Sequence, residues 1–177
     1  MRAGERTLGE ISIGVATTQD ASQVAALRDA VARDMNRQHG EGGWSAIPGT
    51  ATVLRQLRAS RVLIARLASD IVGTVRLTPA KSIVFDSSAF TPVSTALYVL
   101  GLAVAPAARH LGVGRRLMDA AKAAAPAWPA DALWLDAYDS AVGAGPFYRR
   151  CGFREVRRDT FNGVPLIYFE WLVASES

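Results

Sequence analysis

A continuous apolar segment, followed by a glycine-bearing turn and an alanine-rich segment, constrains the fold of this chain more than any other feature. Residues 96–104 read ALYVLGLAV, which is typical of a strand that is covered on both faces of a sheet. Pro106 ends this strand, and the residues from Gly114 to Ala125, with Leu117 and Met118 among the alanines, predict a helix. A doubly covered strand that leads into a helix indicates α/β architecture.

The rest of the sequence alternates between strand-like and helix-like patterns in an order that agrees with this architecture. A strand over 11–15 comes first, and Asp20, three residues before Gln23, predicts a capping box at the start of a helix that continues to Met35. Further along we expect helices over 51–60 and 145–151, strands over 61–68, 71–78 and 133–138, loops over 38–50 and 79–95, and a last hairpin of strands over 153–161 and 166–173 that turns at Asn162-Gly163. This order predicts one domain over residues 1–177, with a mixed six- to seven-stranded central sheet and helices on both faces.

The composition indicates a globular protein without disulfide or metal support. Half of the residues are apolar and 20% are charged, a balance that allows a real core. The single Cys151 excludes an internal disulfide, and His39 and His110 are too far apart in the sequence to form a ligand-spaced pair, so we expect no metal site. There is no apolar run of about 18 residues and no signal-like segment at the start, so the expected location is cytoplasmic, away from the membrane.

The basic charge is moderate and comes almost entirely from arginine. The formal net charge is +4, and only Lys81 and Lys122 are lysines. Such a surface suits an anionic ligand at least as well as nucleic acid. No module of interleaved aromatic and basic residues accompanies the arginines, so we expect no nucleic-acid partner, although an arginine-rich nucleic-acid-binding protein stays open as an alternative.

The turn between the apolar strand and the alanine-rich helix has the chemistry of a diphosphate site. Backbone N–H groups at a helix start converge on one point, where the helix dipole adds positive charge. Gly112 and Gly114 allow close approach because they lack a Cβ, and Arg109 adds a charged fork suited to phosphate oxygens. The P-loop and dinucleotide-binding patterns are not matched. The alternative is that these glycines only shape a tight turn.

Two motifs in the second half of the chain resemble those of the GNAT superfamily of acyl-CoA-dependent N-acetyltransferases. The first is RHLGVG at 109–114, and the second is GPFYRRCGF at 145–153, where the family has a short helix that ends in Tyr, three residues and Gly-Phe. The resemblance covers roughly residues 96–173. It implies a GNAT-like acyl-CoA N-acyltransferase fold, acetyl-CoA as the cofactor, and transfer of acetyl to a small-molecule or peptide primary amine by direct attack in a ternary complex.

The resemblance also assigns a cofactor-binding set and a general acid. The residues expected to bind the pantetheine arm through their backbone are Leu102, Ala103 and Val104, and those expected around the pyrophosphate are Arg109, His110, Leu111, Gly112, Val113, Gly114 and Arg115. Tyr148 is at the position of the proton donor to the leaving thiolate. Its alternative role is that of a packed aromatic residue at a helix end.

The sequence departs from the family at two positions. Ala141 replaces a common asparagine, and Asp139 or Ser140 would have to supply that polar contact to the cofactor. The strand at 96–104 lacks the carboxylate that often acts as base, which leaves Asp136 and Glu170 as candidates by strand position, or an amine that arrives already neutral.

Other expectations are less specific. Trp44, in the loop at 38–50, forms either a wall of the acceptor pocket or a plug in the core. Strand 166–173 is expected to leave an exposed edge that pairs in a homodimer. A binding module that holds CoA without turnover stays open as an alternative function.

Overall fold

The computed structural model describes residues 10–79 and 86–174. The strands are β1 (Ile11–Val15), β2 (Arg61–Leu67), β3 (Asp70–Thr78), β4 (Ala96–Val104), β5 (Ala132–Tyr138), β6 (Arg154–Phe161) and β7 (Val164–Leu172). The helices are α1 (Ala21–His39), α2 (Thr50–Ala59), α3 (Val113–Ala124) and α4 (Gly145–Arg150), with short 3-10 turns η1 (Thr18–Asp20), η2 (Gly43–Ser45), η3 (Ser87–Ala89) and η4 (Pro106–Ala108). Every predicted helix and strand is present, with ends shifted by a few residues.

The strands form one seven-stranded sheet in the order β1-β2-β3-β4-β5-β7-β6. The β4–β5 pair is parallel and every other neighbouring pair is antiparallel, so the predicted mixed sheet is confirmed. In the last hairpin, Asn162 and Gly163 both have positive φ, as the predicted type I′ turn requires.

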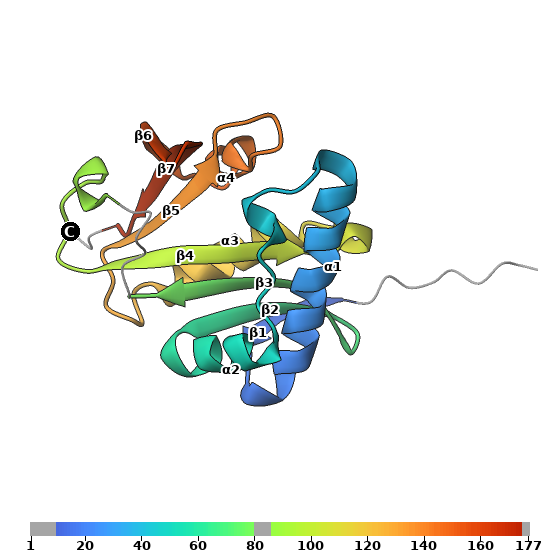
Figure 1. The fold of residues 1–177 in the computed structure, drawn as a ribbon. Helices are drawn as coiled ribbons and strands as arrows, with labels where there is room; N and C mark the ends of the chain where they lie inside the picture. Colours follow the sequence, from blue (N-terminus) through green and yellow to red (C-terminus); the bar gives the residue numbers. More distant parts are fainter. Residues whose placement is uncertain (1–9, 80–85, 175–177) are drawn as a thin grey trace, which may run out of the picture.

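Helices cover both faces of the sheet, as predicted. On one face, α1 and α2 bury a cluster that includes Leu27, Val53 and Ile64 (Figure 1). On the other face, α3 buries a larger cluster around Leu117 and Met118, which α4 joins through Tyr148. None of the helices within 10–79 and 86–174 is long and apolar enough to cross a membrane.

Gly73 on β3 lets α3 approach the sheet closely. A Cβ at this position would lie 2.5 Å from Val113 Cγ1 and 3.0 Å from Leu117 Cδ1, both inside the core. We therefore expect Gly73→Ala to lower the free energy of unfolding by about 1–3 kcal/mol, because the core must shift to admit the methyl group. Chemical denaturation measures this loss. Gly14→Ala on β1 is the matched control, since its Cβ would meet nothing within 4 Å and stability should stay the same or rise slightly; equal losses in both variants would contradict the packing argument.

Two expectations about the ends of elements are wrong. Asp20 does not cap α1 in a box with Gln23. Its carboxylate instead accepts hydrogen bonds from the backbone and hydroxyl of Thr17, while Gln23 accepts from the backbone N–H of Ile71. The strand expected at 166–173 is also not an edge, because β7 lies between β5 and β6 and both its sides are paired. The edge strands of the sheet are β1 and β6, so the dimer pairing expected for the strand at 166–173 cannot use β7. Residues 80–85 of the predicted loop over 79–95 lie outside the described residues.

Candidate functional site

The sheet opens between β4 and β5. The two strands pair only at their beginnings, where the last pair is Tyr98 with Trp134. Beyond this point β4 continues to Val104 and β5 to Tyr138, and the strands diverge (Figure 1). The facing backbone edges therefore have no strand partner in the part of the chain that the structure describes. Buried backbone N–H and C=O groups need partners, so this gap suits an extended ligand that carries amide groups. Leu102, Ala103 and Val104, the predicted pantetheine-binding residues, lie along it.

A bulge in β4 lies at the middle of this gap. On β3, Arg76 pairs with Leu100 and Thr74 pairs with Ala103. One residue of β3 therefore lies opposite two residues of β4, Gly101 and Leu102, which form the bulge. Gly101 has φ +61°, and a Cβ here would lie 2.6 Å from Nη2 of a buried-face arginine on α1, Arg28. The backbone conformation therefore favours glycine, and the absence of a side chain lets the guanidinium of Arg28 lie directly against the bulge.

The gap leads to the N-terminus of α3. Gly112 is the N-cap residue with φ +76°, and His110 also has positive φ (68°). In the first helical turn Arg116 donates to the carbonyl of Gly112, whereas the preceding amides of Val113, Gly114 and Arg115 have no backbone acceptor among the described residues, as is usual for the first turn of a helix. A Cβ on Gly112 would meet nothing within 4 Å. The start of α3 thus presents free N–H groups to open space, which suits an anion.

Gly114 has a packing reason as well. Its Cβ would lie 3.1 Å from Cζ of Phe147, so the absence of a side chain lets α4 pack against the start of α3. Phe147 accordingly has a packing role between α4 and the start of α3.

The two arginines expected near the diphosphate already have partners. Arg109 Nη1 lies 2.6 Å from Asp34 Oδ2 on α1, and this guanidinium is the main cause of the lowered pKa of Asp34. Arg115 donates to the carbonyl of Arg150 at 2.7 Å and lies 3.4 Å from Asp119. The N–H of Leu111 also donates to the carbonyl of Ala108, so the structure leaves the other backbone amides of the 110–115 segment as the principal donors at this turn.

A cavity of about 450 Å³ opens at the β4–β5 gap, between α1, the η2 turn and α4. Its wall includes Arg28, Val31, Met35, Trp44, Leu100, Gly101, Leu102, Ala103, Asp136, Tyr138 and Tyr148. The ring of Trp44 meets that of Tyr138 edge to face, with centroids 5.6 Å apart. Trp44 therefore lies in a cavity wall and is not a plug in the core, and its role in an acceptor pocket stays a prediction.

Tyr148 is placed on this cavity by α4. The side chain is 8% exposed and its ring touches Phe147 and Phe153 edge to face. Within the described chain no group hydrogen-bonds its hydroxyl. Burial, with added effects of Asp136 and Cys151, raises the pKa of Tyr148. The phenol therefore stays protonated at neutral pH, the form in which it can donate a proton.

The two candidate bases, Asp136 and Glu170, differ in their position relative to the cavity. Asp136 lines the cavity, and burial raises its pKa. Glu170 lies outside the cavity, where Thr91 donates to its carboxylate through N–H (2.8 Å) and hydroxyl (2.7 Å) and Arg154 forms an ion pair with it. Burial opposes ionisation of Glu170, but these partners lower its pKa. Only Asp136 of the two faces the cavity.

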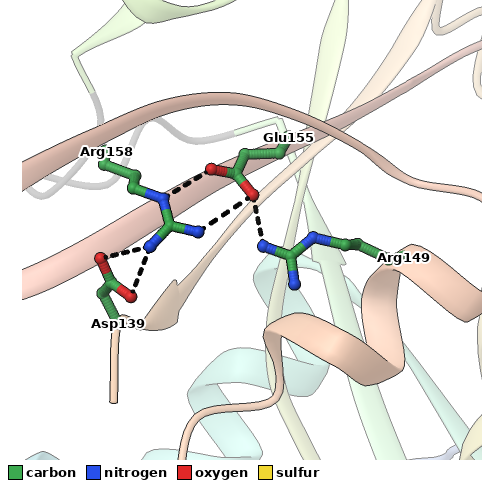
Figure 2. A network of polar contacts seen from close by, with 4 residues as sticks. All are labelled: Asp139, Arg149, Glu155 and Arg158. Atoms are coloured by element: carbon green, nitrogen blue, oxygen red, sulfur yellow. Dashed lines mark hydrogen bonds and ion pairs between the residues drawn. The ribbon is translucent and has the colours of Figure 1, made fainter.

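Ser140 and Asp139 follow β5, near the beginning of α4. Ser140 is exposed and its carbonyl accepts from the N–H of Gly143 at 3.0 Å. Both oxygens of Asp139 lie 2.9 Å from Nη1 of Arg158, which also binds Glu155, and Glu155 accepts from Arg149 on α4 (Figure 2). Asp139 is therefore engaged in a network that ties β5, β6 and α4 together beside Tyr148.

Sequence reasoning missed Arg28 and Tyr138. A signal existed for Arg28, since it lies four residues after Val24 and three before Val31 on the apolar stripe of α1. An arginine on a stripe that faces the core is unusual. Cys151 is buried, and no cluster of three or more metal-binding side chains occurs in the described ranges.

Comparisons with known proteins agree with this geometry. A sequence model described as the acetyltransferase (GNAT) family matches residues 26–153. A GNAT-family acetyltransferase from Streptococcus pneumoniae has a similar structure (TM-score 0.72, 17% identity, 93% of this chain and 100% of that chain). So do the Salmonella typhimurium protein yncA with its cofactor acetyl-CoA (0.68, 16%, 94% and 96%) and the ribosomal-protein-S18-alanine N-acetyltransferase from Escherichia coli (0.68, 14%, 95% and 97%). At these identities the likeness shows the fold. No match was found among curated proteins.

Proposed function

Since this chain belongs to the acetyltransferase (GNAT) family, we propose that it is an N-acetyltransferase that transfers the acetyl group of acetyl-CoA to a primary amine. The amine would attack directly, with both substrates bound in a ternary complex. The observation that carries this proposal is the gap between β4 and β5, which leads to the free amides of α3. The similar Salmonella typhimurium structure that holds acetyl-CoA supports the choice of cofactor.

The residues along the gap suit an acyl-CoA. The unpaired edge of β4 at Leu102, Ala103 and Val104 offers backbone partners to the amides of a pantetheine arm. The amides from His110 to Arg115 suit a diphosphate, and Gly112 leaves room for it. Bound acetyl-CoA would supply an acetyl group activated as a thioester.

Two side chains of the cavity would then act as the proton acceptor and the proton donor of the reaction. A backbone N–H of the β4 bulge would polarise the carbonyl to be attacked. Asp136 would accept the proton that the amine loses, and its raised pKa matches this task. Tyr148 would hold a proton on Oη for the departing sulfur. The rest of the rate enhancement would come from holding the two reactants in one cavity in the correct orientation.

The substitution Asp136→Asn should lower activity and raise stability. We expect kcat/KM to fall by about 100-fold, because a general base is lost. We expect the fold to become more stable at neutral pH, since burial raises the pKa of Asp136 and the charged form is unfavourable in the folded state. This unfavourable contribution is absent below about pH 4, where the carboxyl is protonated in both states, and grows as the pH rises through the raised pKa. Thermal unfolding of both proteins across pH measures it.

Asp70→Asn, at the exposed start of β3, is the control for removal of a carboxylate. It should leave the kinetics unchanged. If Asp136→Asn behaves like Asp70→Asn, then Asp136 is not the base.

A panel of primary amines tests the proposed activity, with acetyl-CoA as donor and free thiol as the readout. The panel should contain polyamines, amino acids, aminoglycosides and peptides with a free N-terminus. Thiol release that depends on the amine supports the proposal. CoA binding with no release for any amine would favour the non-catalytic binding module, and failure to bind CoA would overturn the proposal altogether.

A further inference from the structure

Two arginines that the proposed chemistry does not use lie on the same face of the sheet. Arg28 is in the wall of the cavity, against the backbone of Gly101. Arg76 lies on β3 opposite Leu100, which also lines the cavity. The residues on either side of it, Val75 and Leu77, belong to the core under α3. Alternation along the strand therefore directs Arg76 to the other face, which α1 covers.

Neither arginine has a carboxylate partner among the described residues. By contrast, Arg154, Arg157 and Arg158 on β6 all have acidic partners. Arg28 donates to the neutral amide oxygen of Gln56 at 3.3 Å. The segment 80–85 that follows β3 reads AKSIVF and contains no acid either.

Two partly buried cations without a counter-ion are costly to the fold. Burial lowers the pKa of both guanidiniums, and for Arg28 the neighbouring charge of Arg76 lowers it further. The elements that carry them, α1 and β3, pack against each other, so the two positive charges lie on the same covered face of the sheet. An uncompensated pair of this kind is relieved when an anion binds between or beside them.

The opposite side of the same cavity carries the opposite charge. Asp136 lies on β5, across the opening from α1, and the surface between includes Val31, Met35 and Trp44. The cavity thus offers a carboxylate to an amine, an apolar wall to a carbon skeleton, and a guanidinium to an anion. A planar carboxylate suits the fork of a guanidinium well.

We propose that the amine acceptor is an amino-acid-like molecule with an apolar body, whose carboxylate is bound by Arg28 in the cavity wall. Arg76, which lies on β3 and is not itself a wall residue, adds a second positive charge on the same face of the sheet. This inference rests on the proposed function and names its acceptor class. It also disfavours polyamines and other polycations, because two guanidiniums without counter-ions would repel them.

The kinetic test compares matched acceptors. Each of several apolar amino acids is assayed beside its carboxamide and its decarboxylated amine, with thiol release as the readout. We expect kcat/KM to be about 100-fold higher for the carboxylates, the size of effect seen when one partner of a buried charge pair is removed. The aminophosphonate analogue should be a poorer substrate than the carboxylate.

A binding test gives a readout that is independent of turnover. Calorimetric titration with an N-acetylated amino acid and with its amide measures the carboxylate's contribution directly. Arg28→Gln and Arg76→Gln should each remove the preference for the carboxylate and leave CoA affinity unchanged, which also shows that the variants fold. Arg33→Gln on the exposed face of α1 is the matched control, since Arg33 pairs with Asp29 on the same helix; it should behave like the wild type.

The outcomes separate the two proposals. Carboxylate preference that disappears in Arg28→Gln and persists in Arg33→Gln supports the assignment. Equal use of amines with and without the carboxylate, a preference for the phosphonate or for polycations, or normal CoA binding with no transfer to any amino acid would each overturn it. If CoA itself does not bind, the proposed function fails first.

Discussion

Replacement of Tyr148 by phenylalanine is expected to lower kcat for acetyl transfer by about 100-fold or more, while CoA affinity stays nearly unchanged. The substitution removes only the hydroxyl, which has no hydrogen-bond partner in the described chain, from a side chain that lines the cavity. The ring contacts with Phe147 and Phe153 are kept. Stability should therefore change little, and the loss should appear in turnover. Steady-state kinetics with calorimetric CoA titration measure both quantities.

Tyr168→Phe is the control for removal of a buried phenol. Tyr168 lies on β7 in a separate cluster with Phe90 and Trp134; it is the cross-strand neighbour of Asp136 but does not line the cavity. Its loss should leave kcat unchanged. If Tyr148→Phe retains full turnover, Tyr148 is not the proton donor. It is then a packed aromatic residue at a helix end, which is the alternative role given by the sequence.

Replacement of Gly112 by valine is expected to weaken CoA binding by about 100-fold or more. Two causes act together: a Cβ-branched residue is strained at φ +76°, and its side chain would occupy the open space before the α3 amides. Loss of two charge-assisted hydrogen bonds at about 1.5–3 kcal/mol each accounts for this magnitude. Calorimetric titration with CoA measures the loss.

The matched control for backbone strain is Gly163→Val. Gly163 has φ +80° in the β6–β7 turn, and its Cβ would also meet nothing within 4 Å. Both variants should lose similar stability, but only Gly112→Val should lose CoA affinity. Equal losses of CoA affinity in both variants would show that the effect comes from general destabilisation. Unchanged CoA affinity in Gly112→Val would show that this turn does not bind the diphosphate.

Much of the fold was predictable because local patterns coincide with long-range packing. The apolar run at 96–104 and the Asn162-Gly163 turn specify their structures with few alternatives. The order of strands across the sheet is not local, and the C-terminal strand was wrongly expected at an edge. The second strand of the final hairpin lies beside β5. The alternation of apolar and polar residues along this strand does not show whether it has a neighbouring strand on one side or on both sides.

The candidate site was predictable where it depends on backbone, and less so where it depends on side-chain partners. The glycines at 112 and 114 are where a cradle at the start of α3 needs them. The ion pair of Arg109 with Asp34 joins residues 75 positions apart, a contact that no local pattern reports. The placement of Arg28 and Arg76 on one face of the sheet likewise depends on the packing of α1 against β3.

The central claim is that the amides at the start of α3 and the unpaired edge of β4 form one binding track for CoA. Titration of the isotope-labelled protein with CoA, followed by amide NMR, tests it most directly. We predict that the amides of residues 102–104 and 110–115 show the largest shifts, while those of the β6–β7 turn do not move. Saturable CoA binding that leaves both of these segments unperturbed would contradict the account.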